Sequence, residues 1–447
     1  MALSTPDTLQ QSLSDLPKTD RYLVAFSGGI DSIVLLHTLV ALRDQIDADL
    51  VAVHVNHGLQ SESGDWAAWC SEQCKTYEIP FVQKMVSVNP SKGESMEAVA
   101  RHVRYEALAE EMQPGDVLLT AHHQNDQAET LLLHLLRGAG TAGLAAMPVC
   151  REFAPGYLAR PLLSVSRSQI YTYAEKNGLA WIEDPSNSNL SIERNYLRHR
   201  VIPMMEEHWP GFAVTLSRSA AHCAEADYLL GKQARSLLEQ VLTEHGTLQL
   251  HSFVQLNLPQ RRLVMRAWLQ GAGAPVPNHR KMERLCKEIV DAGRDRQPKV
   301  EWADVVVRRF CDELHLIRRE LLQNPQQGPY LWGKNERMVL PGNGELCLTH
   351  ALGGLNEKLW RSGRVEVGYR QGGERCKPLG RGLTKSVKSL LQEHRVAPWL
   401  RQRQPLVFLD GELAAIPGLC VCESIAVASD QVGLLVDWKK PKMVYTS

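Results

Sequence analysis

The sequence has 447 residues, of which 44% are hydrophobic and 22% charged, a composition that excludes a disordered chain and allows a sizeable buried core. At roughly 150 residues per domain, this length predicts about three globular units and excludes a single small binding module. Fifty lysines and arginines balance fifty aspartates and glutamates, so any attraction to nucleic acid must come from a local basic patch.

From Tyr22 to about Glu183, short β-branched apolar runs alternate with segments of helical periodicity. This alternation is typical of a parallel sheet covered by helices on both faces. The predicted strands are 22–26, 50–55, 81–86, 117–120 and 158–159, and the predicted helices are 31–43, 65–77, 96–112, 126–136 and 167–177. The pattern therefore predicts an N-terminal α/β domain over residues 1–215.

Two further domains are predicted downstream. After Trp209-Pro210-Gly211 the sequence changes to amphipathic helices rich in Ala, Leu and Arg. A polar linker with Pro and Gly later separates these helices from short strand-like runs. The helices are expected at 217–240 and 258–270, the linker at 324–329, and a closing strand pair at 406–409 and 413–416. We expect a helical domain over residues 216–325 and a small α+β domain over residues 326–447.

The local basic patch lies between residues 361 and 403, where eleven lysines and arginines stand against three glutamates. Such an excess predicts a surface that binds a phosphate backbone, and the alternative is a solvated charged face. The residues of this patch that we expect to contact nucleic acid are Arg375, Lys377, Lys385, Lys388 and Arg401.

The spacing of the cysteines and the composition of residues 1–7 favour a cytoplasmic protein. None of the ten cysteines forms a C-x-x-C pair, which argues against a zinc ribbon and against a redox or cluster-binding pair. Residues 1–7 lack the basic start and apolar stretch of a signal peptide, and no apolar run approaches the roughly 18 residues of a membrane span. We expect reduced cysteines and no membrane partner.

The strongest chemical signal is a loop that follows the first predicted strand and opens the first predicted helix. Two glycines let the backbone approach phosphate oxygens, while serine hydroxyls and the helix N-terminus donate hydrogen bonds. The loop has neither the Gly-Lys-[Ser/Thr] ending of a Walker A motif nor the G-x-G-x-x-G spacing of a dinucleotide site. Its acidic residue, Asp31, is suited to hold Mg²⁺ beside the phosphates. The predicted nucleotide-binding residues are Ser27, Gly28, Gly29, Ile30, Asp31 and Ser32.

Polar side chains also follow the second and fourth predicted strands. The carboxyl ends of parallel strands meet at one edge, so the segments 54–59 and 122–130 should converge on the loop. On a helix, Asp126 and Glu129 follow His122 by four and seven residues and share its face, and Arg101 and Arg104 share a face of the third helix. The predicted crevice residues are His57, Arg101, Arg104, His122, Asp126 and Glu129.

Each of these residues has a structural alternative. His54 fits a buried strand equally well, whereas His57 beside a glycine is better placed to face the crevice. His122, His123 and Asp126 suggest a metal site, but no third His or Cys is spaced to complete a zinc site. The Arg101 and Arg104 pair also fits a solvated helix face.

In order and context these motifs resemble those of the tRNA(Ile)-lysidine synthases, a family of the PP-loop (N-type) ATP pyrophosphatases. The segments Trp181–Asn187 and Arg194–Arg198 fit the same family, so the resemblance spans nearly the whole chain. It implies a Rossmann-like catalytic domain of the HUP type, a central helical domain and a basic C-terminal domain. It also implies structural and tRNA-contacting roles for Arg194, Asn195 and Arg198, and we expect Arg101 to contact tRNA as well.

The resemblance implies a ligase that uses ATP and Mg²⁺ to attach free lysine to carbon 2 of the wobble cytidine in the isoleucine tRNA with a CAU anticodon. The tRNA is adenylated first, AMP and pyrophosphate are released, and decoding changes from AUG to AUA. The catalytic residues would be Asp31 at the metal, Arg104 near the phosphate, His122 near the base, and Asp126 and Glu129 as general base or lysine clamp.

Two other functions remain open from the residues alone. A PP-loop tRNA sulfur transferase shares the adenylation step but needs a reactive cysteine or a cluster-binding C-x-x-C pair, which this sequence lacks. A non-catalytic nucleotide-binding protein would not require Asp126 and Glu129 beside a phosphate loop. Whether the protein is a monomer or a homodimer also stays open.

Overall fold

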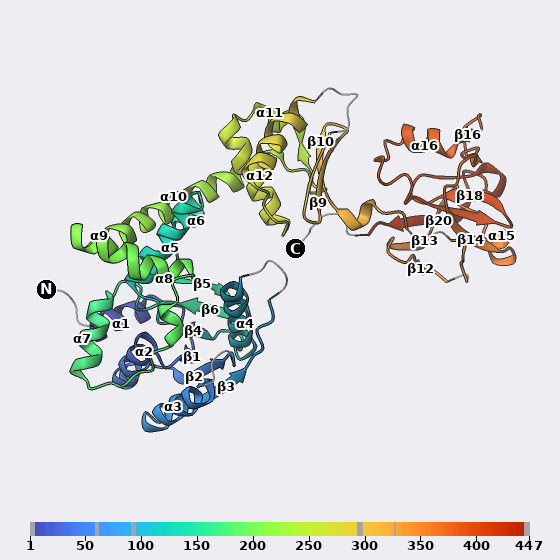
Figure 1. The fold of residues 1–447 in the computed structure, drawn as a ribbon. Coiled ribbons are helices and arrows are strands. Elements are labelled where there is room, and N and C mark those ends of the chain that lie inside the picture. The colour runs from blue at the N-terminus through green and yellow to red at the C-terminus, as the bar shows by residue number, and fades with distance from the viewer. Residues whose placement is uncertain are drawn as a thin grey trace. The chain divides into compact units, whose positions relative to one another are not determined.

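The computed structural model describes residues 5–58, 62–90, 95–292, 298–325, 328–333 and 335–441. They form two compact units, residues 1–229 and 230–447, and the boundary falls inside the long helix α10 (Phe212–Val241) (Figure 1). No helix among the described residues is both long and apolar enough to cross a membrane.

The first unit contains a six-stranded sheet in the order β3-β2-β1-β4-β6-β5. Five strands are parallel and β5 is antiparallel to β6. The strands are β1 (Arg21–Ala25), β2 (Asp49–Asn56), β3 (Phe81–Met85), β4 (Val117–Leu119), β5 (Cys150–Phe153) and β6 (Gly156–Ala159). The predicted parallel α/β fold is thereby confirmed, and β5 is an addition to it. Because the order reverses at β1, the crevice beyond the carboxyl ends of β1 and β4 is the expected ligand site.

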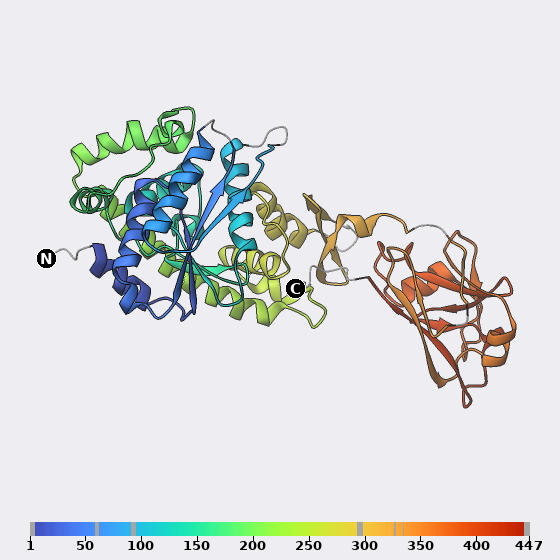
Figure 2. The same cartoon turned by 90° about the horizontal axis from the view of Figure 1, so that it is seen from below.

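Helices cover both faces of this sheet, as the view in Figure 2 also shows. Alternate residues of β1 point to opposite faces: Val24 packs with α2 and α7, whereas Leu23 packs with Leu108 of α4. The helices are α1 (Thr5–Ser14), α2 (Ile30–Ala41), α3 (Ser63–Thr76), α4 (Met96–Glu110), α5 (Gln124–Leu136), α6 (Thr141–Leu144) and α7 (Arg167–Lys176), with a short 3₁₀ turn at Arg43–Gln45. Burial on both faces explains why these strands read as continuous apolar runs.

A helical segment closes the first unit. It comprises a 3₁₀ turn (Pro185–Ser188), α8 (Glu193–Tyr196), a π-helical turn (Leu197–Val201), α9 (Ile202–His208) and the start of α10. Ile202 and Phe212 pack on Ala128 of α5. This packing fixes α8 beside the predicted crevice helix.

The second unit begins with helices packed on a sheet. The helices are α11 (Leu250–Gln255), α12 (Leu258–Gly271), α13 (His279–Glu283) and α14 (Ile289–Asp291), with a π-helical turn at Arg284–Glu288 and a 3₁₀ turn at Arg319–Leu322. The antiparallel sheet has the order β7-β10-β9-β8, formed by β7 (Leu248–Gln249), β8 (Lys299–Trp302), β9 (Val305–Phe310) and β10 (Glu313–Arg318). The predicted helices are present, and the sheet was not predicted.

The remainder of the second unit is built mainly of short strands. A five-stranded sheet runs β11-β14-β17-β18-β19, a three-stranded sheet runs β12-β13-β20, and β15 pairs with β16. These elements are β11 (Tyr330–Leu331), β12 (Arg337–Val339), β13 (Glu345–Leu352), α15 (Glu357–Ser362), β14 (Val365–Tyr369), β15 (Arg375–Cys376), β16 (Lys385–Ser386), α16 (Val387–Glu393), β17 (Pro405–Leu409), β18 (Glu412–Ile416), β19 (Cys420–Val421), a 3₁₀ turn (Glu423–Ile425) and β20 (Val432–Lys439). The predicted closing strand pair corresponds to β17 and β18.

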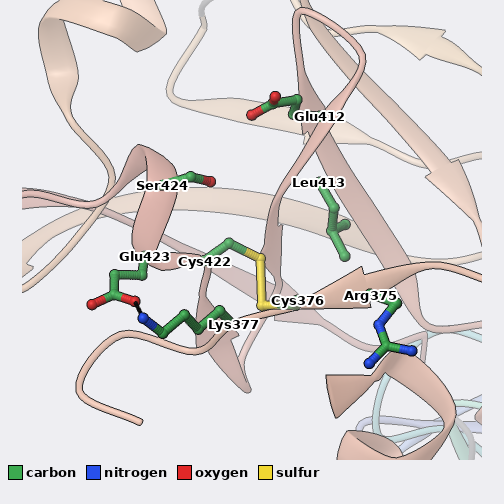
Figure 3. A pocket seen from close by; sticks show the side chains of 8 residues that line it. All are labelled: Arg375, Cys376, Lys377, Glu412, Leu413, Cys422, Glu423 and Ser424. Atoms are coloured by element: carbon green, nitrogen blue, oxygen red, sulfur yellow. Dashed lines mark ion pairs between the residues drawn. A yellow bond between two sulfur atoms is a disulfide. The ribbon is translucent and has the colours of Figure 1, made fainter. Parts of the chain in front are cut away.

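One cysteine pair differs from the expectation of reduced thiols. Cys376 and Cys422 form a disulfide with their Cα atoms 5.6 Å apart, and both side chains are buried. The bond lies in the wall of a 420 Å³ cavity that is also lined by the basic residues Arg375 and Lys377 (Figure 3). The eight other cysteines are free.

Candidate active site

The predicted phosphate-binding loop connects β1 to α2. Gly29 caps the helix in an extended conformation, and its carbonyl oxygen accepts hydrogen bonds from the backbone N–H groups of Ser32 and Ile33 at 3.0 Å. The Ser32 hydroxyl donates to the same oxygen at 2.9 Å and accepts from the Ser27 hydroxyl at 3.2 Å. Two hydroxyls and the first helical turn therefore lie together, an arrangement suited to bind phosphate oxygens.

Gly28 allows this loop to pass close to the side chains of Ile182 and Cys70. Its φ of +85° lies in the left-handed region, and a Cβ at this position would lie 2.6 Å from Ile182 Cδ1 and 2.9 Å from Cys70 Sγ. The Gly28 carbonyl oxygen accepts a hydrogen bond from the backbone N–H of Ile182 at 2.9 Å. Ile182, in the segment 181–187, therefore packs against the loop and is hydrogen-bonded to it.

The carboxylates of Asp126 and Glu129 lie one turn apart on α5 and are both paired with arginines. Glu129, only 1% exposed, accepts from Nε of Arg194 at 2.7 Å and from Nε of Arg198 at 2.8 Å. Asp126 accepts from Nη2 of Arg198 at 3.1 Å and lies 3.4 Å from Nη2 of Arg194. We call these four residues the carboxylate–arginine cluster.

Charges around Asp126 keep it ionised. Burial alone would raise the pKa of Asp126, but the electrostatic interactions with His123, Arg194 and Arg198 outweigh burial and hold that pKa below its usual range. His123 also caps α5, since its backbone N–H donates to Asp126 Oδ2 at 3.1 Å. A carboxylate held so strongly in its charged form is a good electrostatic partner and a weak base.

Asp31 has the features of a metal ligand. Its Oδ1 atom is buried and accepts no hydrogen bond within the described part of the chain, and Nε2 of His123 lies 3.5 Å away. Burial raises the pKa of Asp31, and the His123 charge opposes that rise. A carboxylate oxygen without a hydrogen-bond donor fits Mg²⁺, which prefers oxygen ligands and takes the others from phosphates and water. No cluster of three or more metal-ligating side chains occurs among the described residues.

His122 follows β4 and lies at the same edge of the sheet. Its Nδ1 atom is 2.9 Å from the hydroxyl of Thr120, and burial lowers the pKa of His122 to about 3. The imidazole is therefore neutral at physiological pH. His57 follows β2, and burial together with the charge of Arg104 lowers its pKa as well.

A group of arginines surrounds Tyr105 on α4. The guanidinium carbons of Arg101 and Arg104 lie 5.0 and 5.5 Å from the centre of the Tyr105 ring. Arg101 is exposed, whereas burial lowers the pKa of Arg104. Both residues therefore lie on one stripe, as the spacing predicts.

Arg160 is a residue of this site that we did not predict. It follows β6, is only 4% exposed, and donates from Nη1 to the Pro148 carbonyl at 2.7 Å, while its Nε atom has no partner among the described residues. Burial is the main reason that the pKa of His122 is lowered, and the positive charge of Arg160 lowers it further. Its position after a predicted parallel strand was the signal that could have identified it.

Asn195 is buried and hydrogen-bonds to the backbone of the preceding segment. Its side-chain amide donates to the carbonyl oxygens of Ser186 and Asn189, both at 3.0 Å. Together with the pairing of Arg194 and Arg198, this places all three residues of the motif in contacts within the first unit.

The basic patch is partly neutralised by neighbouring carboxylates. Lys377 pairs with Glu423 at 2.6 Å and Lys385 with Glu393 at 2.7 Å. Arg403, which we counted in the patch, is buried and donates to the Asn343 side chain and the Gln323 backbone, so it is not a surface charge. Arg375 and Lys388 are exposed, and Arg401 donates from Nε to the Val396 carbonyl at 2.8 Å. The exposed excess of positive charge is therefore smaller than the composition indicates.

Comparisons with known proteins find relatives along most of the chain. Three family models match, described as a PP-loop domain over residues 2–205, a TilS substrate binding domain over residues 248–315 and a TilS substrate C-terminal domain over residues 365–438. Among curated proteins, the tRNA(Ile)-lysidine synthase of Methylococcus capsulatus is 41% identical over 93% of this chain and 96% of its own. That of Coxiella burnetii is 38% identical over 98% of this chain and 97% of its own.

Proposed function

The chain belongs to the tRNA(Ile)-lysidine synthase family, and we propose that it attaches free lysine to carbon 2 of the wobble cytidine of the CAU-anticodon isoleucine tRNA. One observation supports this proposal most strongly. The phosphate-binding loop with Asp31 and the carboxylate–arginine cluster lie close together at the crevice of the sheet. The reaction has two steps and uses one ATP.

In the first step, the carbonyl oxygen on carbon 2 of cytosine attacks the α-phosphorus of ATP. An O–P bond forms, the bond from the α-phosphorus to the bridging oxygen breaks, and pyrophosphate leaves with the electron pair. In this proposal the loop amides and the hydroxyls of Ser27 and Ser32 bind the developing charge, and Arg104 is assigned to the phosphates. Mg²⁺ held by Asp31 would supply further charge neutralisation.

In the second step, the uncharged ε-amine of lysine attacks carbon 2, the C–N bond forms, the C–O bond breaks, and AMP leaves. Lysine arrives protonated, because its reference pKa is about 10.4, so its ammonium group must first release one proton to solvent water. Asp126 and Glu129 are suited to attract its ammonium group. The low pKa of Asp126 favours this clamp role over that of general base.

The decisive experiment combines pyrophosphate release with analysis of the tRNA nucleosides. Purified protein, ATP, Mg²⁺ and CAU-anticodon isoleucine tRNA should release pyrophosphate and, with lysine present, yield a cytidine heavier by one lysyl residue. A thiolated nucleoside would instead support the sulfur-transferase alternative, and pyrophosphate release without an adduct would exclude lysine as the second substrate. Intact ATP with folded protein would favour a nucleotide-binding protein.

We further propose that residues 216–325 and 326–447 bind the tRNA body while residues 1–215 perform the chemistry. The exposed basic residues Arg375 and Lys388 would contact phosphates. Such contacts carry no sequence information, so the crevice must read the base.

Lys388→Gln is expected to weaken tRNA binding and to lower the slope of log K against log salt by about one. The measurement is the tRNA dissociation constant over a series of KCl concentrations. Lys75→Gln, an exposed lysine of α3 paired with Glu72, is the matched control and should leave the slope unchanged. An unchanged slope in Lys388→Gln would assign that residue to a solvated face.

Gly28→Ala is expected to weaken ATP binding by about tenfold or more. A left-handed φ costs a residue with a Cβ about 1–2 kcal/mol, and the new Cβ would displace Ile182 from the loop. Binding of a non-hydrolysable ATP analogue can be measured by calorimetry. Gly64→Ala, where a Cβ meets open space, is the control, and equal affinities in both variants would contradict the proposed loop geometry.

A further inference from the structure

The hydroxyl of Thr120, which closes β4, connects His122 to the neighbouring strand. Thr120 is buried, its backbone N–H donates to the Ala159 carbonyl at 3.0 Å, and its hydroxyl lies 3.4 Å from the same oxygen as a donor. Nδ1 of His122 is 2.9 Å from that hydroxyl oxygen. The Thr120 side chain therefore has two partners and a single proton to share between them.

The proton of this hydroxyl determines which ring nitrogen of His122 carries hydrogen. When the hydroxyl donates to Ala159, its oxygen can only accept from His122, so Nδ1 must be protonated. The imidazole is neutral, because burial strongly disfavours the charged form. Nε2 is then left with a bare lone pair.

Charges also act on His122. The negative charge of Asp126 has the largest effect after burial, and the positive charges of Arg160, Arg101 and Arg194 oppose it. Nδ1 is turned toward Thr120, so Nε2 lies on the side of the ring away from that hydroxyl.

We propose that Thr120 is a positioning residue that holds His122 with Nδ1 protonated, so that Nε2 accepts a hydrogen bond from an exocyclic amino group of the substrate base. This inference rests on the proposed function, in which the base is cytidine. Cytosine presents an amino donor at position 4, whereas uracil presents a carbonyl acceptor there. An acceptor in the crevice would therefore select cytidine and repel uridine.

The tautomer can be measured without tRNA or activity. Protein labelled with ¹⁵N-histidine gives long-range ¹H–¹⁵N spectra in which protonated and bare ring nitrogens differ in chemical shift, and His122→Gln identifies the signals of His122. We expect Nδ1 protonated in the wild type and in Thr120→Ser, and a shift toward protonated Nε2 in Thr120→Val. A wild-type protein with Nε2 protonated overturns the proposal.

Base selection is the second readout. We expect Thr120→Val to reduce the preference for C34 over U34 tRNA, measured as the ratio of kcat/KM values, by about tenfold or more, since a buried acceptor loses its fixed orientation. The U34 transcript serves as a competitive inhibitor if its turnover is too slow to follow. Thr120→Ser should keep the preference.

Thr38→Val is the control for the loss of a buried threonine hydroxyl, because the Thr38 hydroxyl donates to the Val34 carbonyl within α2 and has no other partner among the described residues. An unchanged preference in folded Thr120→Val overturns the role in base selection. Absence of lysidine from the wild-type reaction would overturn the proposed function instead, and the spectra would still decide the tautomer.

Discussion

Asp31→Asn is expected to lower the rate of pyrophosphate release by about a thousandfold while the protein stays folded. Asparagine keeps the shape of the side chain but removes the negative charge that would hold Mg²⁺ beside the phosphates. Removal of a single preorganised electrostatic group commonly costs about a hundred- to a thousandfold in kcat. The measurement is pyrophosphate release with ATP and tRNA saturating, over a series of Mg²⁺ concentrations.

The same substitution should raise the thermal stability of the protein. The pKa of Asp31 is raised by burial, so its ionised form is less stable in the folded than in the unfolded state. A carboxyl group with a raised pKa contributes its stability below its unfolded pKa of about 3.9 and loses it as the pH rises through the folded value. At neutral pH, Asp31→Asn should therefore melt at a higher temperature than the wild type.

Asp44→Asn, at an exposed position of the short turn after α2, is the matched control. It should alter neither pyrophosphate release nor stability. Near-normal release by Asp31→Asn at low Mg²⁺ would remove Asp31 from the metal site. A lower melting temperature would mean that the carboxylate supports the fold, in conflict with its buried oxygen that accepts no hydrogen bond from the described residues.

The parallel sheet could be predicted because its strands are buried on both faces. The five predicted strands correspond to β1, β2, β3, β4 and β6, with boundaries within about two residues. The edge strand β5 carries Arg151 and Glu152 and has no apolar run, so its sequence does not indicate a strand. The sheet formed by β7, β10, β9 and β8 was not predicted, although Val305–Phe310 begins with three β-branched residues, because charged residues follow them and flank the other strands.

The candidate site could be predicted where a motif follows a strand, because the topology of a parallel sheet brings such segments together. This reasoning placed Asp31, His57 and His122 at one edge. It could not reveal that Arg194 and Arg198 pair with Asp126 and Glu129, since these partners lie 65 to 72 residues apart in the sequence and belong to different elements. Periodicity relates residues within one helix and carries no information about such contacts.

Glu129→Gln is expected to destabilise the first unit by about 3–5 kcal/mol, because Glu129 is buried and its loss leaves two guanidinium groups, each less than a quarter exposed, without their nearest carboxylate. Glutamine retains the volume of the side chain, so the loss would be electrostatic. Asp126→Asn should cost less, since its contacts with Arg194 and Arg198 are longer, at 3.4 and 3.1 Å. Thermal melting and hydrogen exchange of α5 and α8 report these effects.

The pH dependence of stability provides an independent check on the cluster. The pKa of Asp126 is lowered in the folded state, so its contribution is fully present above its unfolded value of about 3.9 and is lost as the pH falls toward the folded value. Stability of the wild type should therefore decline in acid more steeply than that of Asp126→Asn. Parallel curves would show that the arginines do not stabilise the ionised form.

Lysine kinetics separate the structural role of Glu129 from a role as lysine clamp. If Glu129 mainly holds Arg194 and Arg198, Glu129→Gln will lose stability and pyrophosphate release together, and high lysine concentrations will restore neither. If Glu129 mainly attracts the lysine ammonium, the variant will melt near the wild-type temperature, release pyrophosphate normally, and show a raised KM for lysine alone. The burial of Glu129 at 1% exposure and its contacts of 2.7 and 2.8 Å favour the first result. In that case Asp126, whose contacts with the arginines are longer, is the carboxylate better placed to exchange an arginine for the substrate.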